Sequence, residues 1–440
     1  MSELTVKNTE ARKRLLSLFD EGTFTELDAF AKSADGEIEV VAGYGSVNGV
    51  YVYAFSQDVT VDGGAISVAQ CAKIKKVYEL AKKTGSAVIG IYDSNGMKLK
   101  EGFEALNAYG EILKASTSVS GVVLQISVVA GACLGTSALM ANMADVVIAA
   151  KDADFYVTAP SNVTVEESFK QGTVDILADD VDSAIASAKE LVSVLPSNNL
   201  EVAPMFDFEE KFSDVADANA SAKDIITAVA DDNSVVEIKA GYAENVVTAF
   251  AQMGGSTVGF VAFDGNAVCP NCAYKAEAFI KLCDAFNISI VTFVNAKGLN
   301  SEKENQMLVA ATKLTSAYAT ATCPKISVIT GKAIGTAYIA LAGRGSNADL
   351  VFAWDTAVVS PLDTESAVAF LYNDRLAAGE NRAELEKEYE AEIASPFTAA
   401  ACGAVDDIFV PAETRTKLMN ALSFLDSKRE TTIPRKHSVK

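Results

Sequence analysis

The stretch QISVVAGACLGTSALMANMADVVIA, residues 125–149, decides the fold because it occurs twice in the chain. It returns two hundred positions later as KISVITGKAIGTAYIALAGRGSNADLVFA, residues 325–353. Upstream, SAVIGIYDSNG (86–96) is matched by ISIVTFVNAKG (288–298) in the same order. Each of these segments is a short apolar run that ends in a glycine turn, a pattern that indicates a buried strand. The chain is therefore predicted to contain two divergent copies of one unit.

Each copy begins with a predicted hairpin and continues as alternating helices and strands. EVVAGYGSVNGVYVYAFSQ turns at Asn48-Gly49 between alternating apolar positions, and NVVTAFAQMGGSTVGFVAF turns at Gly254-Gly255. Helices are predicted over 67–85 and 272–287, where apolar residues recur at three and four positions before a closing Gly or Asn. This alternation predicts an α/β fold with mainly parallel sheets flanked by helices.

The length of the chain predicts two domains, and its net charge restricts the classes of partner that it can bind. At 440 residues it exceeds the size at which single cores stop growing, so two domains are predicted, residues 1–215 and 216–440, joined within 196–222. The formal net charge of −21 repels nucleic acids and anionic bilayers. The run from 119 to 143 lacks charges, but its Gly and Ser content indicates a buried strand and a helix start more than a membrane span.

The cysteines and the first residues predict a cytoplasmic protein. Seven cysteines are an odd number without framework spacing, which indicates reduced thiols. The segment MSELTVKNTEARKRLLSLFD is charged and lacks the apolar core of a signal peptide. Cys269-Pro-Asn-Cys272 has redox-motif spacing, but no thioredoxin unit surrounds it, so two ordinary thiols are the favoured interpretation. The acidic run 380–393 indicates a solvated helix face and no metal site.

Four glycine turns could carry chemistry. Reactions through a thioester enolate need two backbone N–H groups aimed at the developing oxyanion, commonly at a helix N-terminus. Such turns occur around Gly96 and Gly135 in the first half and around Gly298 and Gly335 in the second. A single glycine after a buried strand usually serves only a tight turn. Four turns at duplicated positions favour a functional interpretation.

Several segments resemble one known family, the carboxyltransferase subunits of biotin-dependent acyl-CoA carboxylases and decarboxylases. They are ARKRLLSLFDEGTFTEL, FSQDVTVDGG, DSNGMKLKEG, CDAFNISIVTFVNAKG, PKISVITGKAIGTAY, ACGAVDDIFVPAETR and the closing PRKH. The resemblance runs nearly end to end. It implies two tandem crotonase-like domains, with a CoA-binding first half, a biotin-binding second half, and an active site between halves of opposing subunits in a hexamer.

The resemblance also implies roles for individual residues. The Gly135-Thr136 peptide would hold the enolate oxygen of acyl-CoA, and the Thr336-Ala337 peptide beside Gly335 would hold the ureido oxygen of biotin. The residues implied around the two ligands are Gly96, Met97, Gly298, Leu299, Tyr338 and Ile339, and Ile339 hints at a small acyl group. No side-chain acid or base is implied, since N1′ of biotin can take the proton itself. The only histidine, His437, lies in the tail.

The sequence departs from the family pattern at three turns and in one insert. Asp93-Ser94-Asn95-Gly96-Met97-Lys98 stands where members usually carry Asp-Ser-Gly-Gly-Ala-Arg. Gly135-Thr136 and Gly335-Thr336 stand where members usually carry two glycines. Because β-branched residues are disfavoured at positive φ, we expect the threonines to alter the pocket or impair a hole. The stretch 160–184 is shorter than in the family, which weakens inference of the substrate there.

The resulting hypothesis is a subunit that moves CO2 between N1′ of carrier-bound biotin and the α-carbon of a short acyl-CoA. Its implied partners are a biotin carboxyl carrier protein and either a biotin carboxylase or a sodium-pumping membrane decarboxylase subunit, which would bring it to the membrane. One alternative is a biotin-independent crotonase-type enzyme that uses Glu101 or Glu104 as acid or base. Another is a non-catalytic scaffold subunit of such a complex.

Overall fold

The computed structural model describes residues 8–158, 161–211, 220–341 and 343–432. These form two compact units, Met1–Pro204 and Met205–Lys440. The division falls within the segment 196–222, whose described residues belong to no helix or strand except Ala222, where the next helix begins. The PRKH tail with His437 lies outside the described part of the chain.

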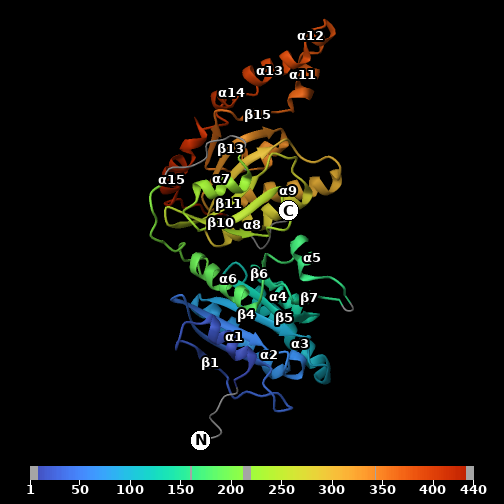
Figure 1. The fold of residues 1–440 in the computed structure, drawn as a ribbon, viewed down its shortest axis with the longest axis vertical. Helices are drawn as coiled ribbons and strands as arrows, with labels where there is room; N and C mark the ends of the chain where they lie inside the picture. The colour runs from blue at the N-terminus through green and yellow to red at the C-terminus, as the bar shows by residue number, and fades with distance from the viewer. Residues whose placement is uncertain (1–7, 159–160, 212–219, 342, 433–440) are drawn as a thin grey trace. The chain divides into compact units, whose positions relative to one another are not determined.

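Unit 1 is built on one mainly parallel eight-stranded sheet (Figure 1). Its strands are β1 (Thr25–Leu27), β2 (Val40–Val47), β3 (Val50–Gln57), β4 (Ala87–Ser94), β5 (Gln125–Leu134), β6 (Val146–Ala150), β7 (Asp154–Tyr156) and β8 (Ile176–Ala178). They run in the order β1-β2-β3-β4-β5-β6-β8, with β7 also paired to β5. The pairs β1–β2 and β2–β3 are antiparallel, and from β3 onward the pairs are parallel.

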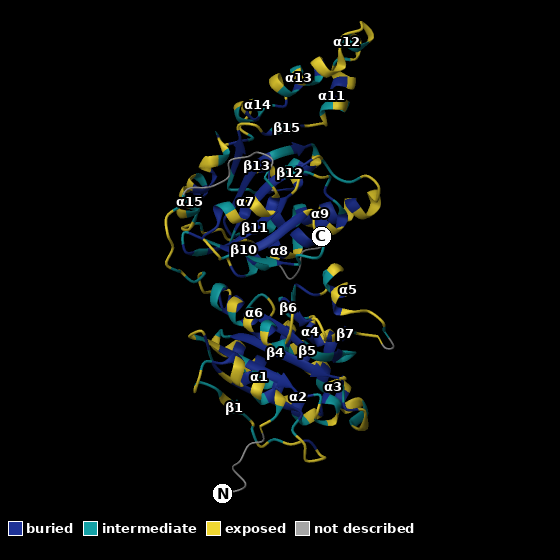
Figure 2. Ribbon diagram, in the orientation of Figure 1, coloured by how far each residue is buried: buried dark blue, intermediate teal, exposed yellow. Residues whose placement is uncertain are grey.

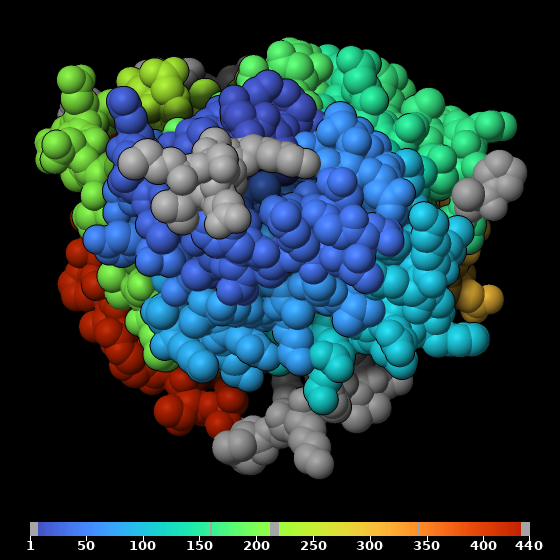
Figure 3. All heavy atoms as spheres, turned by 90° about the horizontal axis from the view of Figure 1, so that it is seen from below, coloured from blue at the N-terminus to red at the C-terminus, as the bar shows by residue number. Residues whose placement is uncertain are grey.

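Helices cover this sheet. They are α1 (Glu10–Leu18), α2 (Val68–Thr84), α3 (Gly102–Thr117), α4 (Thr136–Ala141), α5 (Val165–Lys170) and α6 (Val181–Val194), with short 3-10 turns η2 (Asp62–Gly64) and η3 (Leu99–Glu101). The helix α2 packs on β2, β3, β4 and α3, whereas α1 and α6 pack on each other and on β2. Strands are buried while helices expose their outer faces (Figure 2). In the space-filling view of Figure 3, atoms of unit 1 in blue and cyan form a continuous surface.

Unit 2 repeats this plan. Its strands are β9 (Val236–Ile238), β10 (Val246–Met253), β11 (Ser256–Phe263), β12 (Ser289–Ala296), β13 (Lys325–Ile334), β14 (Leu350–Trp354), β15 (Val358–Ser360) and β16 (Asp407–Phe409). They run in the order β9-β10-β11-β12-β13-β14-β16, with β15 paired to β13. Each strand has a counterpart in unit 1, so the duplication read from the sequence is present in the fold.

The helices of unit 2 are α7 (Ala222–Val229), α8 (Pro270–Ala285), α9 (Glu304–Thr320), α10 (Thr336–Ala340), α11 (Thr364–Leu371), α12 (Asn373–Ala377), α13 (Arg382–Glu392), α14 (Pro396–Ala401) and α15 (Thr414–Leu425), with η4 (Arg344–Ser346) and η5 (Pro411–Glu413). Four of them, α11 to α14, lie between β15 and β16, where the described part of unit 1 has α5 between β7 and β8. The helices α11 and α13 pack together over a small core of their own. The acidic run predicted as a solvated helix face forms α13.

The two predicted hairpins have two-residue turns. Val47 pairs with Val50 around Asn48-Gly49, and Met253 pairs with Ser256 around Gly254-Gly255. The four turn residues have positive φ of 48°, 82°, 62° and 78° respectively. Asn and Gly adopt this conformation readily, and its twist matches that of the strands.

The uncharged run 119–143 contains the whole of β5, the turn at Gly135 and α4. Among the residues that the structure describes, we find no helix long and apolar enough to cross a membrane.

Candidate active site

The two glycine turns of unit 1 lie side by side at one edge of the sheet. This follows from the topology, because β4 and β5 are parallel neighbours with Ser94 beside Cys133. Gly96 has φ of 108°, and a Cβ built on it would lie 3.4 Å from the carbonyl oxygen of Leu134. Gly135 follows β5 with φ of 58° and precedes the first turn of α4.

Unit 2 reproduces this arrangement with matching backbone hydrogen bonds. Gly135 N–H donates to the carbonyl of Tyr156 at 3.0 Å, and Gly335 N–H donates to that of Ser360 at 2.8 Å. The segment before α2 and the one before α8 hold the other turns in the same way. Ile66 N–H donates to Gly96 O at 3.1 Å, and Val268 N–H donates to Gly298 O at 2.9 Å.

Each pair of turns leaves backbone donors without a partner. Within the described chain, we find no hydrogen-bond acceptor for the N–H groups of Met97 and Thr136 in unit 1. The same holds in unit 2 for those of Leu299, Thr336 and Ala337. The first N–H groups of a helix have no intrahelical acceptor, and the helix dipole makes that end attractive to negative charge. Two such donors on adjacent turns are the composition of an oxyanion hole.

The threonines do not strain the backbone of these turns. The expectation that a β-branched residue would have to adopt positive φ there is therefore wrong. Positive φ falls on Gly135 at 58° and on Gly335 at 57°, and neither Thr136 nor Thr336 is among the residues with positive φ. Each threonine is instead the first residue of a helix, α4 or α10. The N–H is therefore retained in ordinary helical geometry.

A hollow of about 950 Å³ in unit 2 gathers most of the residues predicted for that half. Gly298, Leu299, Gly335, Thr336 and Ile339 line it. Apolar side chains from α9 and the ends of β13 and α10 contribute to its wall, namely Met307, Leu308, Ile334 and Ile339. The hollow thus combines unpaired backbone donors with an apolar lining.

Two predicted residues of unit 2, Ala337 and Tyr338, do not line the hollow. The hydroxyl of Tyr338 donates to the carbonyl of Ala404 at 3.0 Å, and its side chain is absent from the lining. Burial raises the pKa of Tyr338, which keeps this hydroxyl protonated. Ala337 is fully buried as a whole residue and is also absent from the lining, so neither its methyl group nor its N–H is exposed to the hollow.

A network of buried hydroxyls that the sequence analysis missed ties the two turns of unit 1 together. Tyr109 on α3 donates to Gly96 O at 3.1 Å, and its oxygen lies 3.1 Å from the Oγ of Ser137 on α4. Ser137 Oγ donates to Ser94 Oγ at 3.2 Å, and Ser94 Oγ accepts from Gly96 N–H at 3.1 Å. Burial raises the pKa of Tyr109, so its phenol remains a neutral donor.

Unit 2 lacks the serines of this network. Ala296 pairs with Ala333 in β13 as Ser94 pairs with Cys133 in β5, and Ala337 is second in α10 as Ser137 is second in α4. A serine at a strand end facing a helix start was the available signal, but only the fold brings the three hydroxyls together.

The two lysines near the unit 1 turns, Lys98 and Lys100, differ in burial and in whether their charge is paired. Lys98 is buried, and its Nζ lies 2.8 Å from Asp35, 3.2 Å from Glu39 and 3.2 Å from Asp62. Its charge is therefore already compensated. Lys100 is exposed and follows the same turn, so it is a better candidate than Lys98 for binding a phosphate.

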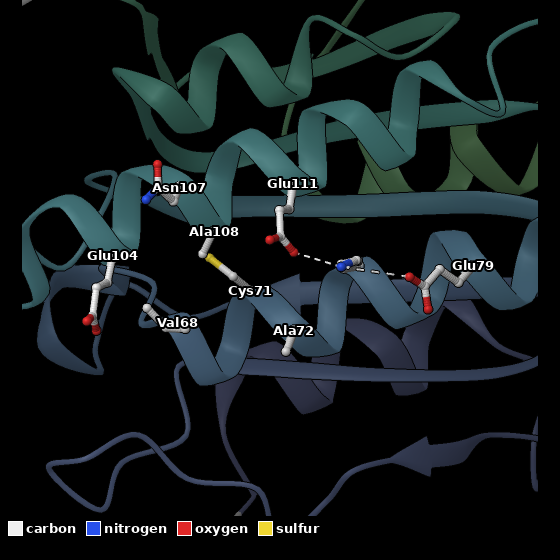
Figure 4. Close-up of a pocket in the computed structure, with 9 residues that line it drawn as sticks. Val68, Cys71, Ala72, Glu79, Glu104, Asn107, Ala108 and Glu111 are labelled. Carbon is white, nitrogen blue, oxygen red and sulfur yellow. Dashed lines mark hydrogen bonds and ion pairs between the residues drawn. The ribbon is translucent and has the colours of Figure 1, made fainter.

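A separate hollow of about 500 Å³ lies between α2 and α3 (Figure 4). Lys75 bridges Glu79 and Glu111 across it at 4.0 and 2.7 Å. It contains none of the predicted glycine turns, although Glu104 lines it. The carboxylate of Glu101 accepts a hydrogen bond of 2.6 Å from the N–H of Val68, the first residue of α2, and thus serves as a helix cap.

Comparison with known proteins shows the family of the chain. The model of the carboxyl transferase domain matches residues 7–439. The chain belongs to the carboxyl transferase family. Its relatives include the alpha subunit of methylmalonyl-CoA decarboxylase from Veillonella parvula, 35% identical over 97% of this chain and 92% of the relative. The beta chain of propionyl-CoA carboxylase from Saccharopolyspora erythraea is 35% identical over 97% and 89%.

A solved structure agrees with both family and fold. Transcarboxylase 12S, a hexamer with methylmalonyl-CoA bound, superimposes on this carboxyltransferase with a TM-score of 0.91 at 34% identity, covering 97% of this chain and 92% of that one. The corresponding 12S subunit from Propionibacterium freudenreichii subsp. shermanii is 34% identical over 97% and 90%. The predicted α/β fold of two crotonase-like units and the assignment to biotin-dependent acyl-CoA carboxyltransferases are thereby confirmed.

Proposed function

We propose that the backbone donors of the two units divide the substrates of one carboxyl transfer between them. Met97 N–H and Thr136 N–H, beside Gly96 and Gly135, bind the thioester oxygen of an acyl-CoA. Leu299 and Thr336 supply the N–H groups for the ureido oxygen of biotin. The observation that carries this proposal is the duplicated pair of turns, each with free donors beside a glycine of positive φ.

The hollow of unit 2 fits biotin by its chemistry. A ureido ring needs donors for one polar oxygen and apolar surface for its fused ring and chain. The free N–H groups of Leu299 and Thr336 stand at a wall formed partly by Met307, Leu308 and Ile339. When bound, biotin supplies N1′ as the nitrogen that gives or receives the carboxyl group. Leu299 and Thr336 would hold and orient the ureido oxygen through their backbones.

In unit 1 the donors act on charge at the thioester oxygen. As the bond between the α-carbon and the carboxyl group breaks or forms, negative charge develops on that oxygen. The N–H groups of Met97 and Thr136 are oriented before the reaction, so they stabilise this charge without reorganising. One such donor is worth about 3 kcal/mol in comparable sites.

The side chains near the turns support this mechanism over a biotin-independent one. Crotonase-type acid–base chemistry would need a free carboxylate, but Glu101 already caps α2. Glu104 lines the hollow between α2 and α3 and none of the predicted turns. The proposal assigns both candidates structural roles.

The substrate that we propose is the pair methylmalonyl-CoA and propionyl-CoA. Relatives named for each are about equally similar to this chain. The partner sets the direction of transfer. A biotin carboxyl carrier protein delivers biotin, and either a biotin carboxylase or a sodium-pumping membrane subunit completes the complex. We further propose a hexamer acting in the cytoplasm, with any membrane association made by the partner.

The test is decarboxylation with free biotin. Purified protein is incubated with malonyl-CoA, methylmalonyl-CoA or glutaconyl-CoA in turn, with and without biotin, and CO2 and acyl-CoA products are measured. We expect biotin-dependent conversion of methylmalonyl-CoA to propionyl-CoA. Turnover that does not need biotin would favour the crotonase-type alternative. Absence of turnover with a thioester-induced rise in melting temperature would favour the scaffold alternative.

A further inference from the structure

Cys269 and Cys272 form a close pair at the start of α8. Their sulfur atoms lie 2.6 Å apart, and Cys269 Sγ accepts a hydrogen bond of 3.1 Å from the N–H of Cys272. Cys269 is the N-cap residue and Pro270 opens the helix, so the chain direction at this point is fixed. A disulfide bond is about 2.05 Å long, so closing it needs a movement of about half an ångström.

The two sulfurs differ in ionisation and access, as the two members of a redox pair do. The hydrogen bond from Cys272, together with backbone N–H groups, lowers the pKa of Cys269 to about 6 although burial opposes this. The pKa of Cys272 is raised by the same hydrogen bond and by burial. Cys269 is half-buried and Cys272 is buried. The ionisable groups that face the pair are Tyr242, Asp264 and Lys275.

The other cysteines do not share this environment. Cys71, Cys133, Cys283 and Cys323 are buried, and burial raises the pKa of each of them. Cys402 is exposed. A thiol reagent therefore has two accessible targets, Cys269 and Cys402, and of these only Cys269 has a second thiol in contact with it.

The pair is joined directly to the turn that lines the hollow of unit 2. Val268, the residue before Cys269, donates its N–H to Gly298 O at 2.9 Å and accepts from Asn300 N–H at 2.9 Å. Leu299 lies between these two bonds and pairs with Val268 as an isolated bridge. A change in the backbone at Cys269 therefore reaches the N–H of Leu299 through one residue.

Unit 1 has the same connection without the thiols. Ile66 bridges Met97 as Val268 bridges Leu299, so Ser67 corresponds to Cys269 and Gln70 to Cys272. Ser67 Oγ donates to Glu39 Oε2 at 3.0 Å. The fold thus does not require cysteines at this position, and the pair belongs to unit 2 alone.

The geometry points to a redox-active dithiol at Cys269 and Cys272 whose disulfide state is transmitted to the Gly298–Leu299 turn. The oxidant is a low-molecular-weight disulfide such as glutathione disulfide. The Cys269 thiolate attacks one of its sulfurs, forming a mixed disulfide and releasing one thiolate. Cys272 then loses its proton and attacks Cys269, which forms the internal disulfide and releases the second thiolate. The sequence alone favours two ordinary thiols, whereas the cap and the sulfur contact favour exchange.

The first test uses the full chain in glutathione buffers of increasing oxidation, followed by acid quenching and peptide mass spectrometry. We expect a Cys269–Cys272 linkage, seen as loss of two hydrogen atoms from one peptide and reversed by dithiothreitol. Cys272→Ser should accumulate a glutathione adduct on Cys269, and Cys269→Ser should give neither product at this segment. Cys402→Ser is the matched control and should leave the linkage unchanged. A fully reduced pair in the most oxidising buffer would overturn the proposal.

The second test measures transmission to the turn, which rests on the proposed function. With free biotin, we expect the oxidised protein to show a KM for biotin changed at least twofold, restored on reduction, with the KM for acyl-CoA unchanged. Cys269→Ser should be insensitive to glutathione disulfide. A disulfide that forms without moving the KM for biotin would overturn the transmission. Loss of all transfer in both redox states would instead count against the proposed function, because the mass spectrum still reports the disulfide.

Discussion

Gly135 and Gly335 hold backbone conformations that other residues adopt only under strain. Their φ and ψ are 58° and −121° in the first case and 57° and −130° in the second. Residues held in such regions cost about 1–3 kcal/mol unless they are glycine. A Cβ on Gly135 would meet nothing within 4 Å, whereas one on Gly335 would lie 3.1 Å from the carbonyl oxygen of Pro361.

Replacing each glycine by alanine should separate the two substrates. Gly135→Ala is expected to raise the KM for acyl-CoA or lower kcat about tenfold, because a displacement costing 1.4 kcal/mol is tenfold in affinity. Gly335→Ala should act in the same way on biotin and should lose more stability because of the added contact with Pro361. Steady-state kinetics with each substrate varied, together with thermal melting, measures both effects.

A matched control is Gly49→Ala, at the hairpin turn with φ of 82° and open space around the new Cβ. It carries similar strain away from the glycine turns, so it should lower the melting temperature without changing either KM. Equal kinetic effects of Gly135→Ala and Gly335→Ala on both substrates would refute the division between units.

At the scale of elements, the buried hydroxyls join α3 and α4 to the end of β4. Tyr109→Phe removes the donor to Gly96 O and leaves Ser137 with one partner fewer. We expect a loss of about 1–3 kcal/mol in the free energy of unfolding. We also expect a lower rate of carboxyl transfer with acyl-CoA, because the N–H groups of Met97 and Thr136 are no longer fixed relative to each other.

Tyr318→Phe provides the comparison. Tyr318 is a buried tyrosine of α9 whose hydroxyl lies 2.8 Å from Thr292 Oγ1 in β12. This variant should lose similar stability on denaturant unfolding while its kinetics stay unchanged. If both variants left transfer with acyl-CoA intact, the hydroxyl network would be structural only.

The elements themselves could be predicted from the sequence, whereas their side-chain partnerships could not. Asn48-Gly49, Gly254-Gly255 and the apolar spacing of α2 and α8 are local signals, and the structure confirms them. The four glycine turns were also visible. The network of Ser94, Tyr109 and Ser137 joins residues on three elements, so no local pattern reveals it. Likewise, only the backbone shows that positive φ falls on Gly135 and not on Thr136.

Across the whole molecule, the duplication extends to a buried lysine in each unit. Lys73 donates to Val40 O at 2.9 Å, and Lys275 donates to Val246 O at 2.7 Å, each the first residue of a hairpin strand. Both lysines are almost fully buried, and this burial lowers the pKa of each to about 8. The unfolded chain would lose the same protons near pH 10.

Stability should therefore depend on pH through these lysines. A folded-state pKa below the unfolded one means that the charged lysine destabilises the fold below about pH 8, and that this penalty is relieved as pH rises towards 10. Relative to the parent, Lys275→Met should become less stable by about 2 kcal/mol between pH 7.5 and pH 10. Denaturant unfolding at the two pH values measures the difference.

Lys281→Met on the same helix is the control, because its side chain is 61% exposed. Its stability relative to the parent should be the same at both pH values. A constant difference for Lys275→Met would show that Lys275 keeps its proton throughout this range.

The free donors at the glycine turns belong to the peptide backbone, and this affects how the sequence of such a site can change during evolution. Substituting Thr136 or Thr336 by any residue except proline leaves the N–H group in place. An alanine scan would therefore pass over the groups that face the substrates and would register the neighbouring glycines instead. Homologues that share the turn can differ in side chains there while the chemistry persists. What is inherited is the conformation of the backbone, and the residue types at these positions are free to change.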